Sequence, residues 1–208
     1  MNAVNICNLA LSLLGDSANV SSIDPPEGSV QAEQCARFYP IALTSLLESH
    51  PWTFATKRER LARLSATSGQ WRFAYSKPSK CLRVLRVVSP DRMPMRGVAA
   101  TDPAIQSEHY EMYRIGDTEA ILTNIENAEV HFITSDVKTG MFSPMFRDAL
   151  ALRLAVDLAG TIVKGKDGRD TRRALFPEFQ IAFSRAAAAD SNQRRIDLDF
   201  IPESMMVR

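Results

Sequence analysis

The sequence lacks the features that mark a membrane-spanning, secreted or disulfide-stabilised protein. No run of apolar residues approaches the ~20 that cross a bilayer, and residues 2–5 carry no positive charge of the kind that opens a signal peptide. The 3 cysteines, Cys7, Cys35 and Cys81, lie far apart and form no CxxC pair. An odd number of separated cysteines favours reduced thiols in a cytosolic compartment. We therefore expect no membrane contact and a chain that stays where it is made.

Residues for catalysis or metal binding are also scarce. The 3 histidines, His50, His109 and His131, have no partner at metal-ligand spacing. The sequence contains no GxSxG, HExxH or EF-hand pattern and no complete phosphate-binding loop. We therefore expect a protein without enzymatic activity, bound metal or cofactor. One enzyme hypothesis stays open, because Cys81 can meet His109 or His131 in space.

Charge is abundant but segregated along the chain. A total of 25 lysines and arginines against 24 aspartates and glutamates leaves a net charge of +1, which argues against a globally basic nucleic-acid-binding protein. Counted by segment, the net charge is −4 over 1–52, +9 over 53–96, −7 over 97–136, +5 over 137–195 and −2 over 196–208. Adjacent blocks of opposite sign can pair within one fold or between copies of a subunit. The sequence leaves both arrangements open.

Hydrophobic residues at helical spacing predict four helices, two near each end of the chain. The expected helices cover about residues 6–14, the segment from Ser29 to Pro51, the segment from Ser143 to about 163, and the segment from a charged turn at 164–170 to about Asp190. Ser29 and Ser143 are placed to cap the second and third helices. The third helix is apolar around most of its circumference, so we expect it to be buried.

Between the two helix pairs, the hydrophobic pattern changes to that of strands. The expected strands cover residues 71–75, 81–88, 109–115, 120–123 and 129–134. Gly116 and Asp117 predict a hairpin turn between the third and fourth of these strands. Residues 89–107 contain three prolines and are expected to form an irregular loop.

Together these elements predict an α+β fold. An antiparallel-type helical bundle is expected from residues 1–57 and 141–190, with a small β-rich lobe inserted at 58–140. Residues 191–208 are expected to form a C-terminal tail. Apolar residues on such a tail are either disordered or docked on a neighbouring molecule.

The most basic segment, residues 57–86, also contains aromatic residues. Trp71, Phe73 and Tyr75 are interleaved with arginines, which resembles the composition of a nucleic-acid-binding platform. Strict alternation along a strand, however, puts the aromatic and the basic side chains on opposite faces. We therefore favour an aromatic core with a solvated basic face, and keep a nucleic-acid-binding module as the alternative function.

Several segments of the sequence resemble a known family. The residues that carry the resemblance are Ile6-Cys7-Asn8-Leu9-Ala10-Leu11-Ser12-Leu13-Leu14-Gly15, Ile23-Asp24-Pro25, Phe38-Tyr39-Pro40, Leu46-Leu47-Glu48-Ser49-His50-Pro51-Trp52-Thr53-Phe54-Ala55, Trp71-Arg72-Phe73-Ala74-Tyr75 with Pro78, and Leu82-Arg83-Val84. They are similar to the tail tubular protein A family, the head-to-tail adaptors of short-tailed bacteriophages. The similarity covers roughly residues 4–90.

This resemblance implies a structural protein of the virion. It implies a ring of copies of this chain, a dodecamer in the family, that lies below the portal protein, connects it to the downstream tail nozzle protein and lets genomic DNA pass. It also implies assembly in the host cytoplasm and a final place in the virion tail. The motif residues with implied packing roles are Pro51, Trp52, Phe54, Trp71, Phe73, Tyr75 and Pro78. Trp52 and Phe54 are expected to anchor the turn after the second helix, and the later aromatic residues to fill the β-rich lobe.

Two groups of residues are candidates for contacts in such an assembly. The candidate subunit interface comprises Arg83, Arg86, Phe200, Ile201, Met205 and Met206. The candidate channel or portal contact comprises Lys164, Lys166, Arg169, Arg172 and Arg173. The two arginines of the first group follow from the hypothesis that the +9 and −7 segments meet at least partly across subunits. For the second group, a solvated turn between two helices is the competing interpretation.

Overall fold

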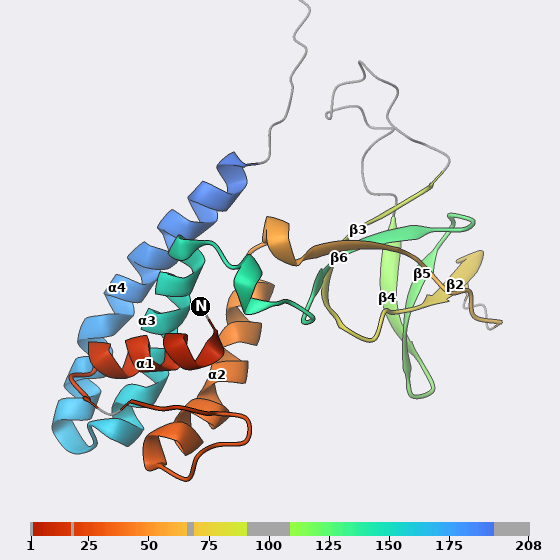
Figure 1. Cartoon of the computed structure of the whole chain (residues 1–208). Helices are drawn as coiled ribbons and strands as arrows, with labels where there is room; N and C mark the ends of the chain where they lie inside the picture. Colours follow the sequence, from red (N-terminus) through yellow and green to blue (C-terminus); the bar gives the residue numbers. More distant parts are fainter. Residues whose placement is uncertain (1, 18, 66–68, 91–108, 194–208) are drawn as a thin grey trace, which may run out of the picture. The chain divides into compact units, whose positions relative to one another are not determined.

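The computed structural model describes residues 2–17, 19–65, 69–90 and 109–193, which form two compact units (Figure 1). The described residues of Met1–Ala55 and Ser135–Gln193 form a helical unit. Those of Thr56–Thr134 form a sheet unit. Each unit buries its own set of apolar side chains.

The helical unit contains four α-helices among its described residues. They are α1 (Ala3–Leu13), α2 (Val30–Ser49), α3 (Pro144–Ile162) and α4 (Gly165–Asn192), with short 3-10 helices η1 (Thr53–Ala55) and η2 (Thr139–Met141). The Ser29 side chain accepts from the backbone N–H of Ala32 at 3.2 Å, and that of Ser143 accepts from Phe146 at the same distance. Both predicted caps are therefore confirmed, since each satisfies an N–H that the first helical turn leaves without a partner.

Helix α3 lies at the centre of this unit. α1, α2 and α4 all pack against it, and its side chains are buried on several faces, as the sequence predicted. α4 approaches it closely at Gly168, where a Cβ atom would lie only 2.7 Å from the carbonyl oxygen of Ala159. Glycine at this position allows the two backbones to touch.

The structure corrects the start of the fourth helix. The sequence predicted a charged turn over 164–170, but α4 begins at Gly165 and the connection from α3 is only Val163 and Lys164. The close packing of Gly168 on α3 explains the difference, because this buried contact holds the otherwise exposed first turns of α4 against α3. Of the predicted tail, residues 191 and 192 belong to α4, and 194–208 lie outside the described residues.

The sheet unit contains six described strands in two antiparallel sheets. The strands are β1 (Thr56–Arg60), β2 (Phe73–Ser76), β3 (Cys81–Val88), β4 (Tyr110–Ile115), β5 (Thr118–Thr123) and β6 (Glu129–Thr134). The strand orders are β1-β6-β3 and β2-β5-β4. The predicted β4–β5 hairpin is confirmed, and Gly116 in its turn adopts a φ of +59°, which glycine accepts at no steric cost.

The core of the sheet unit is shared by the two sheets. Tyr75 and Ile121 from one sheet cluster with Val87, Val130 and Phe132 from the other. The Tyr75 hydroxyl, although buried, donates to the carbonyl oxygen of Ile125 at 2.8 Å, so burial leaves it satisfied. The unit thus has an apolar centre independent of the helices.

The predicted fold class is wrong. We expected an α+β helical bundle carrying a small β-rich lobe, but the described residues form a mixed architecture of four α-helices and two three-stranded sheets, in which the sheets make up a sizeable domain. The sequence underestimated this part because β1 has no apolar alternation: four of its five side chains are exposed. Its partner β6 lies far along the chain, and a local hydrophobic pattern cannot reveal the pairing of such distant segments.

Candidate interface on the arginine face

Four arginines share one face of the β1-β6-β3 sheet. In the pairing register, His131 of β6 lies opposite Arg58 of β1 and Arg86 of β3. Residues directly opposite one another in a sheet point to the same face. The register likewise places Arg60 opposite Glu129, and Arg83 opposite Ile133. We call the four residues Arg58, Arg60, Arg83 and Arg86 the arginine face; the other face of β6 turns Val130 and Phe132 into the core.

Two irregularities in β3 make this face possible. The register of β3 against β6 shifts between Cys81 and Arg83 and again between Val84 and Arg86. Strict alternation would put Arg83 and Arg86, three positions apart, on opposite faces. Each shift inserts one extra residue, as a β-bulge does, and so turns both arginines to the same side.

His131 lies at the centre of the arginine face. Arg86 Nε donates to His131 Nδ1 at 2.9 Å, and His131 Nε2 lies 3.3 Å from a carboxylate oxygen of Glu129. Burial lowers the pKa of His131, and the neighbouring charges of Arg86 and Arg58 lower it further, against the opposing effect of Glu129. The imidazole is therefore held neutral, which suits its role as the acceptor for Arg86.

The arginine face is chemically suited to anions. Arg58 and Arg60 are exposed, and Arg83 and Arg86 are half-buried. A guanidinium presents a rigid fork of N–H donors that matches a carboxylate or a phosphate in two-point contact. Arg86 already donates to His131, so the exposed Arg58 and Arg60 are the groups of this face most accessible to an acidic protein surface or to phosphates.

The aromatic residues of the basic segment do not join the arginine face. Tyr75 is buried in the core and Phe73 packs against it. Trp71 precedes β2, a strand of the β2-β5-β4 sheet. Its indole Nε1 donates to Glu111 at 2.8 Å. The four residues of the arginine face are thus separated from Phe73 and Tyr75, whereas the guanidinium of Arg63, outside that face, lies 4.7 Å from the centre of the Phe73 ring. Trp71 stays outside the core cluster. Pro78, which follows β2, accepts a backbone hydrogen bond from Cys81.

The aromatic motif of the helical unit packs as a cluster. Trp52 is completely buried, and its indole nitrogen donates to the carbonyl oxygen of Leu46 at 2.8 Å. The rings of Trp52 and Phe54 meet Phe146 of α3 edge to face, with centroids 4.8 and 4.9 Å away. Together with the half-buried Pro51, these rings hold the turn after α2 against α3.

The candidate channel contact forms the start of α4. Lys164, Lys166, Arg169, Arg172 and Arg173 are all exposed. Lys164 and Lys166 stand at the positive end of the helix dipole, where cations are unfavourable. Arg173 lies 3.8 Å from Asp170, a weak pairing for two exposed groups. The helix dipole therefore does not explain these charges, which lie on an exposed surface.

Opposite charges of neighbouring segments meet within the described part of the chain. Lys77 Nζ contacts a carboxylate oxygen of Glu119 at 2.7 Å, and this hydrogen bond holds the pKa of Glu119 below its usual value. The +9 and −7 segments thus pair in part inside one molecule. The remaining interface candidates, Phe200, Ile201, Met205 and Met206, lie outside the described residues.

The residues of the enzyme hypothesis are not brought together. Cys81 belongs to the core of the sheet unit, where burial raises the pKa of its thiol, the opposite of what a nucleophile needs. His131 points to the other face of β6, and His109 is exposed beside β4. Within the described ranges, no group of three or more His, Cys, Asp or Glu side chains is arranged to hold a metal ion. No described helix has the length and apolar character needed to span a bilayer.

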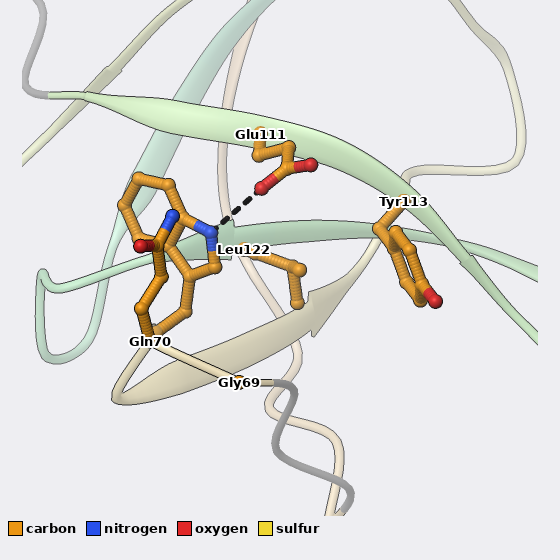
Figure 2. Close-up of a pocket in the computed structure, with 6 residues that line it drawn as sticks. Gly69, Gln70, Glu111, Tyr113 and Leu122 are labelled. Carbon is orange, nitrogen blue, oxygen red and sulfur yellow. Dashed lines mark hydrogen bonds between the residues drawn. The ribbon is translucent and has the colours of Figure 1, made fainter.

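One pocket of the sheet unit was not foreseen from the sequence. It has a volume of about 280 Å³ and is lined by Gly69, Gln70, Trp71, Glu111, Tyr113 and Leu122 (Figure 2). The only sequence signal was the spacing of Glu111 and Tyr113, which puts both on one face of a strand. Trp71 could not be assigned to this pocket, because it comes from a segment 40 residues earlier.

A scan against models of known protein families finds no match for this chain, and a search of curated proteins finds no relative.

Proposed function

We propose that this chain is a structural head-to-tail adaptor of a short-tailed phage, which assembles with copies of itself into a ring below the portal protein. The proposal starts from the resemblance of residues 4–90 to the tail tubular protein A family. The observation that carries it is the arginine face, a rigid and strongly cationic surface suited to an acidic surface on a neighbouring subunit.

A ring interface joins two different patches on each subunit. Such a head-to-tail contact closes by rotation, so one flank of the chain meets the other flank of the next copy. Charge complementarity between the flanks fixes the register of the contact. The exposed Glu126 of the −7 segment is a candidate for the matching patch.

The helical unit also exposes large apolar side chains that are available to a neighbouring subunit. Phe176 and Ile181 of α4 are 43% and 53% exposed. In a ring, contacts with the next subunit would cover such side chains. The basic start of α4 offers a second contact for the portal or for DNA passing through the ring.

The test is assembly of the full chain with its cognate portal protein, followed by electron microscopy. The wild-type chain should form a symmetric ring on the portal. Charge reversal of the half-buried pair in R83E/R86E should abolish rings. R58E/R60E should also abolish rings, and because Arg58 and Arg60 are exposed, this variant is less disruptive to folding. The matched control K138E/R185E changes the net charge equally at exposed residues of the helical unit and should leave rings intact.

Circular dichroism and native mass establish that each variant is a folded monomer before mixing. Rings that form equally well with both reversed pairs would contradict the proposed interface. A wild-type chain that neither binds the portal nor forms a ring would overturn the adaptor function itself.

A second candidate function uses the same face for nucleic acid. The arginine geometry that favours it fits phosphates as well as carboxylates. If four phosphates are neutralised, the affinity of a purified monomer for duplex DNA should fall with salt at a logarithmic slope of about −3.6. Fluorescence anisotropy with a labelled duplex measures this slope, and R58E/R60E should flatten it. An affinity for DNA that changes neither with salt nor in R58E/R60E would rule out nucleic-acid binding by the arginine face.

A further inference from the structure

The unforeseen pocket lies on the face of the β2-β5-β4 sheet that turns away from the core. Glu111 of β4 lies opposite Leu122 of β5, so both point to this face, and Tyr113 joins them two residues along β4. Leu122, only 1% exposed, forms the floor. The indole Nε1 of Trp71 donates to one oxygen of Glu111 at 2.8 Å, the bond drawn as a dashed line in Figure 2.

This pocket has the chemistry of a cation site. Trp71 and Tyr113 supply two aromatic rings, and the faces of such rings attract ammonium and guanidinium groups. Glu111 supplies a full negative charge beside them. Among the residues that the structure describes, no lysine or arginine forms an ion pair with Glu111. Its charge is therefore available to a cation from outside the described chain.

The size of the pocket limits what that cation can be. A volume of about 280 Å³ lies just below the range of roughly 300–1,000 Å³ usual for drug-sized ligands. The end of one arginine or lysine side chain is small enough for this space. A large cofactor is too big for this space.

The neighbouring strand edge indicates that the cation is carried by a polypeptide. β4 is at the edge of its sheet, and no described strand pairs with its outer side. The opposite edge, at β2, is covered: Ser76 and Leu64 form backbone hydrogen bonds that tie residues 62–64 to β2. An uncovered edge presents backbone N–H and C=O groups that an extended segment can pair with.

We propose that the Trp71–Glu111–Tyr113 pocket binds an arginine or lysine side chain of an extended segment that another protein adds alongside β4. The strand pairing supplies affinity, and the pocket selects the charged side chain at one position. This inference uses neither the arginine face nor ring assembly, so the failure of one proposal would leave the other unaffected.

The experiment follows the two tryptophan indole N–H signals of the full chain by NMR. Trp52 is buried in the helical unit, whereas Trp71 lines the pocket, so the first signal is an internal control. The probe is the blocked pentapeptide Thr-Val-Arg-Val-Thr. It should shift the Trp71 signal and leave that of Trp52 in place.

Three comparisons separate the parts of the proposal. Replacing the peptide's arginine by neutral citrulline should weaken binding about tenfold, and E111Q should do the same, because both remove the charge interaction. N-methylation of the peptide backbone should also weaken binding, since it blocks strand pairing. Free acetyl-arginine amide should bind more weakly than the pentapeptide.

An unshifted Trp71 signal at millimolar peptide, or equal binding of the citrulline peptide, would overturn the cation site. Equal affinity for free acetyl-arginine amide would overturn the strand pairing. Unchanged backbone spectra of E111Q establish that any loss arises at the pocket, and Glu119→Gln, on the adjacent strand, is the matched control.

Discussion

Asp190, near the end of α4, holds Thr53, which lies 137 positions earlier in the chain. Both carboxylate oxygens of Asp190 accept from the backbone N–H of Thr53 at 3.1 Å, and one also accepts from its hydroxyl at 3.2 Å. His50 Nε2 lies 3.4 Å from the same carboxylate. A buried aspartate is thus satisfied by the first residue of η1, and it fastens the turn after α2 to α4.

We expect D190A to lower the free energy of unfolding by about 1.5–3 kcal/mol, because it removes the charged acceptor of the Thr53 backbone N–H and hydroxyl. Urea unfolding followed by circular dichroism measures the change. The control is D148A, since Asp148 is exposed on α3 and should cost less than about 0.5 kcal/mol. Equal stability of the two variants would show that this contact does not fasten the turn.

We expect G168A to destabilise the helical unit by about 1–3 kcal/mol, because its Cβ would overlap the Ala159 carbonyl and push α4 away from α3. Thermal unfolding by calorimetry tests this. G160A is the matched control: it also replaces a helical glycine, but its Cβ meets no atom within 4 Å. That variant should be neutral or up to ~1 kcal/mol more stable, and a similar loss in both would refute the close-approach argument.

The protein should lose stability as the pH falls through the ordinary His131 pKa of 6.5. Because burial lowers this pKa in the folded state, the unfolded chain binds the proton more readily, and protonation favours unfolding. H131N keeps an acceptor for Arg86 but cannot titrate. The variant should therefore lose less stability than the wild type between pH 7.5 and 5, as measured by urea unfolding.

The corresponding control is H109N, because His109 is exposed. Its stability should follow the wild-type dependence on pH. If H131N and the wild type have the same dependence, the buried imidazole does not govern it.

The three free thiols should react slowly with Ellman's reagent in the native protein. Cys7 and Cys35 are completely buried, and a hydrogen bond to Cys35 together with burial raises the pKa of the Cys7 thiol far above its ordinary range. Burial likewise raises the pKa of Cys81. In 8 M urea, used to unfold the chain, all three should react at the rate of free cysteine. Rapid native reaction of even one thiol would contradict its burial.

The parts of the structure that were predicted correctly depend on short-range interactions. A cap such as Ser29 or Ser143 bonds a backbone N–H three residues away, and the turn at Gly116 joins adjacent strands. Strand β1 was missed because charged, exposed residues conceal its pairing with β6. The start of α4 was misplaced because only its packing on α3 distinguishes it from a loop.

By itself, the sequence determined the four helices, five of the six described strands and the burial of the third helix, since periodicity, caps and turn residues act over a few positions. Only the tertiary structure decided which charged and aromatic side chains share a surface. The bulges of β3 turn Arg83 and Arg86 to one face, and Trp71 reaches Glu111 across 40 positions. These placements depend on strand register between distant segments, which no local pattern encodes.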